Sequence, residues 1–276
     1  MGSVYPPYAF PQMGLFFEPG GKLQARILIE LLSLASLALM AWFSHHTLRP
    51  YGREIALVGA VAVVAIAGNG TALALGQFSI ICVGLITVQW LAILGRRPIV
   101  AGIAWGMAML KPQIALPFVL LFLAEGLQVG SVVGVALVAL LSWMACLWTE
   151  VPVRTVIDFW RSGMSMRFAA EGYGLGPGAI ARWLGADHRI VQVVMLGGML
   201  VFAVPLVVFM RRHGRKAILP VAAACGVIGM FACYHRPYDH VMLFPTLLGV
   251  LVVAAGSRRA WPAVVAVAMV ASLVIP

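Results

Sequence analysis

The stretch GRRPIVAGIAWGMAMLKPQIALPFVLLFL, residues 95–123, decides how the rest of the chain is arranged. Both halves of this stretch are apolar, and Lys111-Pro112 separates them. A proline breaks the helix behind it and suits the first turn of a new helix, and a lysine at mid-membrane costs roughly 2.5–3.5 kcal/mol. We therefore predict two short legs, 99–110 and 112–124, with Lys111 at their tip near one membrane surface. The alternative is one long kinked span.

The composition indicates an integral membrane protein. The chain has 276 residues, of which 62% are hydrophobic and only 10% charged, and this excludes an ordinary soluble domain. Repeated apolar runs near twenty residues are the length that a membrane-spanning helix requires, and they lack the alternation of a β-barrel. We predict an all-α transmembrane bundle with about nine membrane helices, including the short hairpin at 99–124.

The remaining spans follow from the apolar runs on either side of the hairpin. They are predicted at 26–47, 54–67 with an extension to 75, 77–94, 126–148, 189–210, 217–233, 241–256 and 260–275. Residues 149–188 form the longest non-apolar segment and are predicted to be an extracytoplasmic loop. The whole chain, 1–276, is predicted to be a single transmembrane domain.

Charge supports the hairpin over the single span. The short loops that carry most of the basic residues are 49–53, 95–97, 211–216 and 257–259. With the hairpin all four fall on one side, which the positive-inside rule makes cytoplasmic, whereas a single span would divide them between two sides. The net charge of +10 then favours anionic lipid head groups or a phosphorylated substrate as partners. Nucleic acid is not an expected partner, because the basic residues sit between spans.

The opposite, extracytoplasmic face collects the unusual polar residues. One is Lys111, which precedes the start of a helix, where a phosphate site is favoured; the alternative is a lysine that snorkels to the interface. Another group is the hinge Tyr234-His235-Arg236-Pro237-Tyr238-Asp239-His240 between two apolar runs. Its Asp–His pairs suit proton transfer and Arg236 suits an anion, and the alternative is a hydrated loop that anchors two helix ends. The spacing matches no standard metal site, so we predict no metal.

Four segments of the chain together resemble glycosyltransferase family 87, within the GT-C membrane glycosyltransferases. They are Tyr5-Pro6-Pro7 before a span that begins Ala25-Arg26-Ile27, GQFSIICVGL at 76–85, the stretch 95–123, and YHRPYDHVMLFP at 234–245. The third is the most specific, and the resemblance covers most of the chain. The family is similar to the polyprenyl-phosphate-mannose-dependent α-mannosyltransferases.

The resemblance implies an enzyme that takes a sugar, such as mannose or another hexose or pentose, from a polyprenyl-phosphate donor. A lipid or glycan acceptor then receives the sugar at the extracytoplasmic face, in a bacterial plasma membrane. No cofactor beyond the donor substrate is implied. The alternative is a non-catalytic protein that binds or transports lipid-linked sugars.

The resemblance also implies roles for individual residues. The catalytic candidates are Asp239, His235 and His240, and the donor-phosphate candidates are Lys111, Arg236, Arg161 and Arg167. Enzymes of the GT-C type usually carry an acidic base in the first outer loop, just after a first span. In this chain Tyr5-Pro6-Pro7 comes at once, so we expect that the sequence lacks an N-terminal span, or that Asp239 or Glu18 substitutes for that base.

Overall fold

The computed structural model describes residues 5–17, 21–123, 127–158, 183–232 and 237–275. Every regular element in these ranges is a helix, which confirms the predicted all-α class. The elements before residue 150 are α1 (Ala9–Phe17), α2 (Gly21–Leu48), η1 (Arg49–Tyr51), α3 (Arg53–Val64), α4 (Ala67–Ala74), α5 (Ser79–Leu94), α6 (Pro98–Ala108), α7 (Pro112–Ala115), η2 (Leu116–Leu123) and α8 (Gln128–Thr149). Those near the C-terminus are α11 (His188–His213), η3 (Gly214–Ala217), α12 (Ile218–Ala232), η4 (Pro237–Leu243), α13 (Phe244–Gly256) and α14 (Ala260–Val274).

Several of these helices have the dimensions of membrane spans. Within the described ranges, four helical segments are long and apolar enough to cross a bilayer: Gly21–Tyr51, Arg53–Ala74, Gln128–Thr149 and Tyr238–Gly256. Shorter apolar helices include Ser79–Leu94, Pro98–Ala108, Pro112–Leu123 and Ala260–Val274. The chain is therefore an integral membrane protein, and the predicted total of about nine membrane helices stays a prediction.

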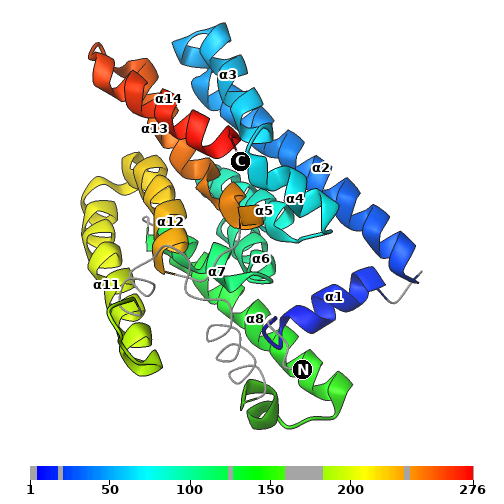
Figure 1. The fold of residues 1–276 in the computed structure, drawn as a ribbon. Helices are drawn as coiled ribbons and strands as arrows, with labels where there is room; N and C mark the ends of the chain where they lie inside the picture. Colours follow the sequence, from blue (N-terminus) through cyan, green and yellow to red (C-terminus); the bar gives the residue numbers. More distant parts are fainter. Residues whose placement is uncertain (1–4, 18–20, 124–126, 159–182, 233–236, 276) are drawn as a thin grey trace.

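The predicted hairpin is present. Figure 1 shows α5, α6 and α7 in the middle of the bundle, between α2–α3 on one side and α11–α12 on the other. Gly102 and Gly106 of α6 face Gly130 and Gly134 of α8 in the same order, so α6 and α8 run in the same direction. The chain must therefore return between them, and α7 with η2 makes that return. The alternative of one long kinked span is wrong.

The four basic loops lie at one end of the bundle. Arg215 of η3 donates hydrogen bonds to the carbonyl oxygens of Leu94 and Ile93, which brings the loop 211–216 against the end of α5. A Cβ on Gly256 would lie 3.4 Å from the ring of Tyr51, so the loops 257–259 and 49–53 are also neighbours. The helices α12 and α13 are antiparallel, and Thr246 of α13 is bonded to Ala223 of α12. The loop 211–216 before α12 and the loop 257–259 after α13 therefore lie at the same end, together with the loops that they contact. We refer to this as the basic end.

The returning leg is not a regular α-helix, because Pro117 interrupts its hydrogen bonding and residues 116–123 form a 3₁₀ helix. In a membrane the carbonyl groups released in this way need partners from the protein. The Trp105 indole donates to Ala115 at 2.9 Å, and the Gln89 amide donates to Phe118 at 3.0 Å. The Cys225 thiol lies 3.1 Å from the carbonyl oxygen of Pro117. These contacts, from α6, α5 and α12, hold the hairpin in the centre.

Close packing of α6 on α8 depends on glycine. A Cβ at Gly134 would lie 2.5 Å from the Trp105 ring and 2.9 Å from the carbonyl oxygen of Gly102. Small residues spaced by four let membrane helices approach in this way.

We expect Gly134→Leu to lower the free energy of unfolding by about 1–3 kcal/mol, measured by denaturant titration in detergent. Gly70→Leu is the matched control, because nothing lies within 4 Å of a Cβ there. Equal effects at both positions would contradict the close packing.

Candidate functional site

The two charged residues that are buried in the described ranges form an ion pair with each other. Lys111 Nζ lies 2.9 Å from Asp239 Oδ1, and the two residues are only 3% and 1% exposed. The hydroxyl of Ser79 donates to the same carboxylate oxygen at 2.6 Å and accepts a hydrogen bond from Lys111 Nζ at 2.8 Å. Lys111 Nζ also donates to Gln77 Oε1 at 3.4 Å. We call Gln77, Ser79, Lys111 and Asp239 the polar cluster.

Three breaks in the helical chain place these side chains together. The first lies between α4 and α5, where Gly76 adopts φ +60° and Ser79 is the first residue of α5. The second is the tip of the hairpin, where α6 ends at Ala108 and Lys111 stands at the N-cap position before Pro112 and the next helix. The third is η4, which carries Asp239 in its first turn. Each break leaves room for a polar side chain that an unbroken apolar helix would not hold.

The lysine of the cluster is fully engaged. An ammonium group has three N–H donors, and the carboxylate of Asp239, the hydroxyl of Ser79 and the amide oxygen of Gln77 accept all three. The ring of Tyr238 lies 4.7 Å from Nζ, close enough for a cation–π contact. A buried ion pair recovers its desolvation cost only with good geometry and further hydrogen bonds, and the polar cluster provides both.

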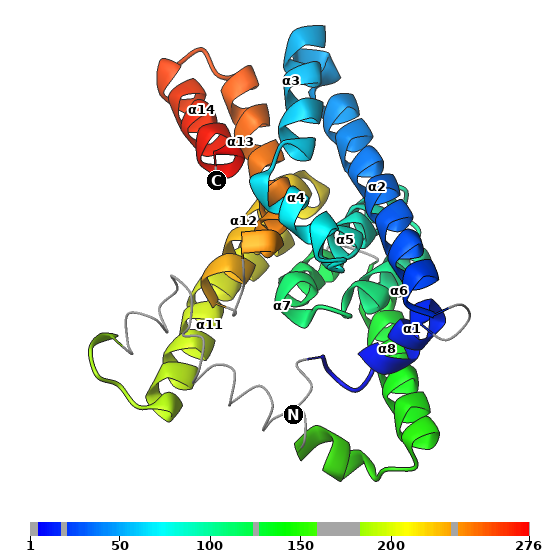
Figure 2. The same ribbon diagram turned by 45° about the vertical axis from the view of Figure 1, so that its right-hand side comes forward.

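The N-terminal segment borders the cluster. Tyr5 packs edge-on against Phe78, the residue before Ser79, with ring centroids 6.4 Å apart. Burial, with a smaller contribution from Cys82, raises the pKa of Tyr8 above its ordinary range, so the phenol stays protonated. Figure 2 shows α1 next to α2 and α8. A Cβ on Gly14 of α1 would lie 2.5 Å from the ring of Trp148 in α8. The Tyr5-Pro6-Pro7 segment thus lies at the same end of the bundle as the polar cluster.

The structure brings together two of the predicted site residues and places a third next to them. Lys111 and Asp239, 128 positions apart, share a hydrogen bond, and His240 follows in η4, half-buried. His235, Arg236, Arg161 and Arg167 lie outside the described residues. The alternative of a lysine that snorkels to the interface is wrong, because the Lys111 side chain is buried and paired with Ser79 and Asp239. Its placement near one membrane surface stays a prediction.

Sequence reasoning did not single out Ser79. Its hydroxyl bridges the two charged groups, and it lies within the segment GQFSIICVGL that carries part of the family resemblance. The available signal was a small hydroxyl residue at the first position of an apolar helix, just after a glycine. Such a residue most often caps its own helix, so position alone did not indicate a contact with residues 32 and 160 positions away.

The polar cluster can exchange one charged partner for another. Across the described residues, no group of three or more His, Cys, Asp or Glu side chains lies close enough to hold a metal ion. The polar cluster instead sets a cation and a carboxylate side by side. An anionic ligand competes with the Asp239 carboxylate for the Lys111 ammonium group. A ligand that displaces the carboxylate leaves it free to accept a proton.

A comparison with protein families gives a match. The family model described as glycosyltransferase family 87 matches residues 4–234, a range that includes Gln77, Ser79 and Lys111 of the polar cluster. Searches of curated proteins and of solved structures found no match.

Proposed function

Because the chain belongs to glycosyltransferase family 87, we propose that it moves a sugar from a polyprenyl-phosphate donor to a lipid or glycan acceptor. Membership of this family makes the chain a membrane glycosyltransferase. The donor class, the acceptor class and the membrane face of the reaction are our proposal. The buried pair of Lys111 and Asp239 carries this proposal, because it supplies the two kinds of group that such a transfer needs.

The depth of the cluster suits the phosphate of a lipid donor. α5 has 16 residues between the cluster and the basic end, so it rises about 24 Å. The hydrocarbon core of a bilayer is about 30 Å thick. The cluster is therefore close to the head-group region opposite the basic end. The positive-inside rule makes that face extracytoplasmic, in keeping with a site that a lipid-linked sugar reaches from outside.

In the proposed cycle the donor phosphate replaces Asp239 as the partner of Lys111. Phosphate oxygens accept charge-assisted hydrogen bonds from the ammonium group, which also stabilises the charge of the leaving phosphate. The released carboxylate of Asp239 accepts the proton of the acceptor hydroxyl, while the oxygen of that hydroxyl attacks the anomeric carbon of the sugar. The bond between that carbon and the phosphate oxygen breaks, and polyprenyl phosphate leaves with the electron pair. Ser79 and Gln77 hold the lysine in position throughout.

The distribution of charge favours an enzyme over a transporter of lipid-linked sugars. A transporter is expected to carry polar sites along a path between the two faces, near the bilayer midplane. In the part of the chain that the structure describes, Lys111 and Asp239 are the buried charged residues, and both lie at the same level. His240, on the next position of η4, extends the polar surface at that level.

The donor class can be tested directly. In proteoliposomes, we expect the protein to transfer labelled mannose, or another hexose or pentose, from polyprenyl phosphate to a membrane-extracted acceptor. The same sugar supplied as a nucleotide sugar should give no transfer above the level of empty liposomes. Transfer from the nucleotide sugar at an equal or higher rate would overturn the proposed donor class.

A further inference from the structure

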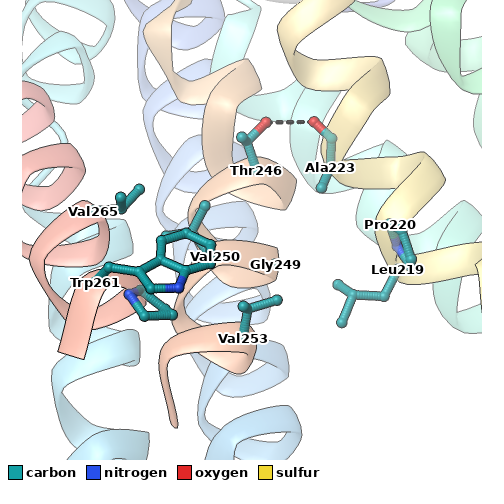
Figure 3. Close-up of a pocket in the computed structure, with 10 residues that line it drawn as sticks. Leu219, Pro220, Ala223, Thr246, Gly249, Val250, Val253, Trp261 and Val265 are labelled. Carbon is teal, nitrogen blue, oxygen red and sulfur yellow. Dashed lines mark hydrogen bonds between the residues drawn. The ribbon is translucent and has the colours of Figure 1, made fainter. Parts of the chain in front are cut away.

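A second candidate site lies on the outside of the C-terminal helices. A groove of about 360 Å³ runs between α12 and α14, with α13 as its floor (Figure 3). Its walls include Leu219, Ala223, Gly249, Val253, Trp261 and Val265. The volume is within the range of small-molecule sites, about 300–1,000 Å³.

The lining of the groove is almost entirely apolar, so it can contact an apolar ligand along its length but offers few hydrogen-bond partners to a polar one. Thr246 and Trp261 are the lining residues with a polar group in the side chain, and the Thr246 hydroxyl already donates to the carbonyl oxygen of Ala223 at 2.6 Å. This bond joins α13 to α12 beside the groove, as Figure 3 shows. The end of the groove towards Val253 and Trp261 opens at the basic end of the bundle. An alkyl chain that enters from that side meets an almost entirely apolar surface.

Basic residues surround the open end. Lys216 lies one turn before Leu219, and Arg258 with Arg259 immediately precedes the helix that begins at Ala260 and carries Trp261. All three basic residues are exposed, and none forms an ion pair with an acidic residue in the ranges that the structure describes. Arg215 differs from them, because its guanidinium is bonded to the carbonyl groups at the end of α5.

We infer that this groove binds an anionic glycerophospholipid from the leaflet at the basic end. Its phosphate lies against Lys216, Arg258 and Arg259, and one acyl chain occupies the groove beside Val265. The apolar lining favours an acyl chain, and the three basic residues at the open end favour a negative head group. Each basic residue near an anionic surface strengthens binding. This site lies at the opposite end of the bundle from the polar cluster and does not depend on the proposed donor.

The head-group part of the inference predicts a preference by charge. Binding of a phosphatidylglycerol to the full chain in a zwitterionic detergent is measured by native mass spectrometry, against a phosphatidylcholine with the same acyl chains. We expect the double variant Arg258→Gln, Arg259→Gln to weaken phosphatidylglycerol binding by about 30-fold. The matched control, Arg96→Gln with Arg97→Gln, removes two charges from another loop of the same end and should leave binding unchanged. Lys216→Gln gives a second, single-residue measurement should the double variant not fold.

The acyl-chain part predicts a position-specific block. Val265→Trp fills the groove and should abolish phosphatidylglycerol binding, whereas Val264→Trp, at a 65% exposed neighbour that does not line the groove, should leave it intact. Equal binding of the two phospholipids, equal loss in both arginine double variants, or equal effects of the two tryptophans would overturn the inference. Displacement of phosphatidylglycerol by polyprenyl phosphate at equal concentration would also overturn it and assign the groove to the donor chain.

Discussion

Replacing Lys111 alone by methionine is expected to lower the free energy of unfolding by about 3–5 kcal/mol, because it leaves the buried carboxylate of Asp239 without its partner. Asp239→Asn alone should lower the free energy of unfolding by a similar amount, because it leaves the buried Lys111 ammonium group without its partner. The double variant Lys111→Met, Asp239→Asn should be more stable than either single variant. It removes both charges, and the asparagine keeps an oxygen for the Ser79 hydroxyl.

A double-mutant cycle by denaturant unfolding in detergent measures this coupling. The chain offers a matched control in the pair Arg26–Glu30. Its contact distance of 2.8 Å is close to the 2.9 Å of the buried pair, but its side chains are 62% and 39% exposed. Arg26→Gln should cost less than about 0.5 kcal/mol, as exposed helix pairs do. Additive effects of Lys111→Met and Asp239→Asn would show that the two groups are not paired in the folded protein.

The same double variant is expected to be folded and almost inactive. In the proposed cycle Lys111 stabilises the charge on the leaving phosphate, and loss of one such group typically lowers kcat by about a hundredfold to a thousandfold. Ser79→Ala should have a smaller effect on transfer, of about tenfold, since Gln77 still positions the lysine. The measurement is the rate of sugar transfer from the polyprenyl-phosphate donor in proteoliposomes.

A variant that is stable but inactive separates the two roles that a buried ion pair can have. If the pair only holds the hairpin tip against η4, the neutral double variant should transfer sugar at a rate close to that of the original protein. Lys22→Gln, an exposed lysine near the start of α2, serves as the control for loss of one positive charge. Its rate should be unchanged.

Much of the fold was predictable because the membrane restricts it so strongly. The apolar runs gave spans such as 126–148 and 260–275, where the structure has helices Gln128–Thr149 and Ala260–Val274. The Lys111-Pro112 pair identified the hairpin, since a proline and a charge inside an apolar run admit few other arrangements. The loop charges then set all four basic loops at one end.

The site was predictable only in part. The sequence indicated that Lys111 and Asp239 share one face of the membrane, but not that they pair with each other. That pairing depends on how α5, the hairpin tip and η4 pack, and no local pattern reports a contact between residues 128 positions apart. Ser79 was missed for the same reason, because its bridging role appears only when both charged partners are in place.

The most direct measurement for the proposed donor site is the affinity for polyprenyl phosphate, the product that carries the phosphate but no sugar. Binding to the purified protein in nanodiscs needs no acceptor and no turnover. We predict that the folded double variant Lys111→Met, Asp239→Asn binds this lipid about tenfold to a hundredfold more weakly than the original protein, as expected for loss of a charge-assisted hydrogen bond. Equal affinity in the two proteins would contradict the assignment of the polar cluster as the phosphate site.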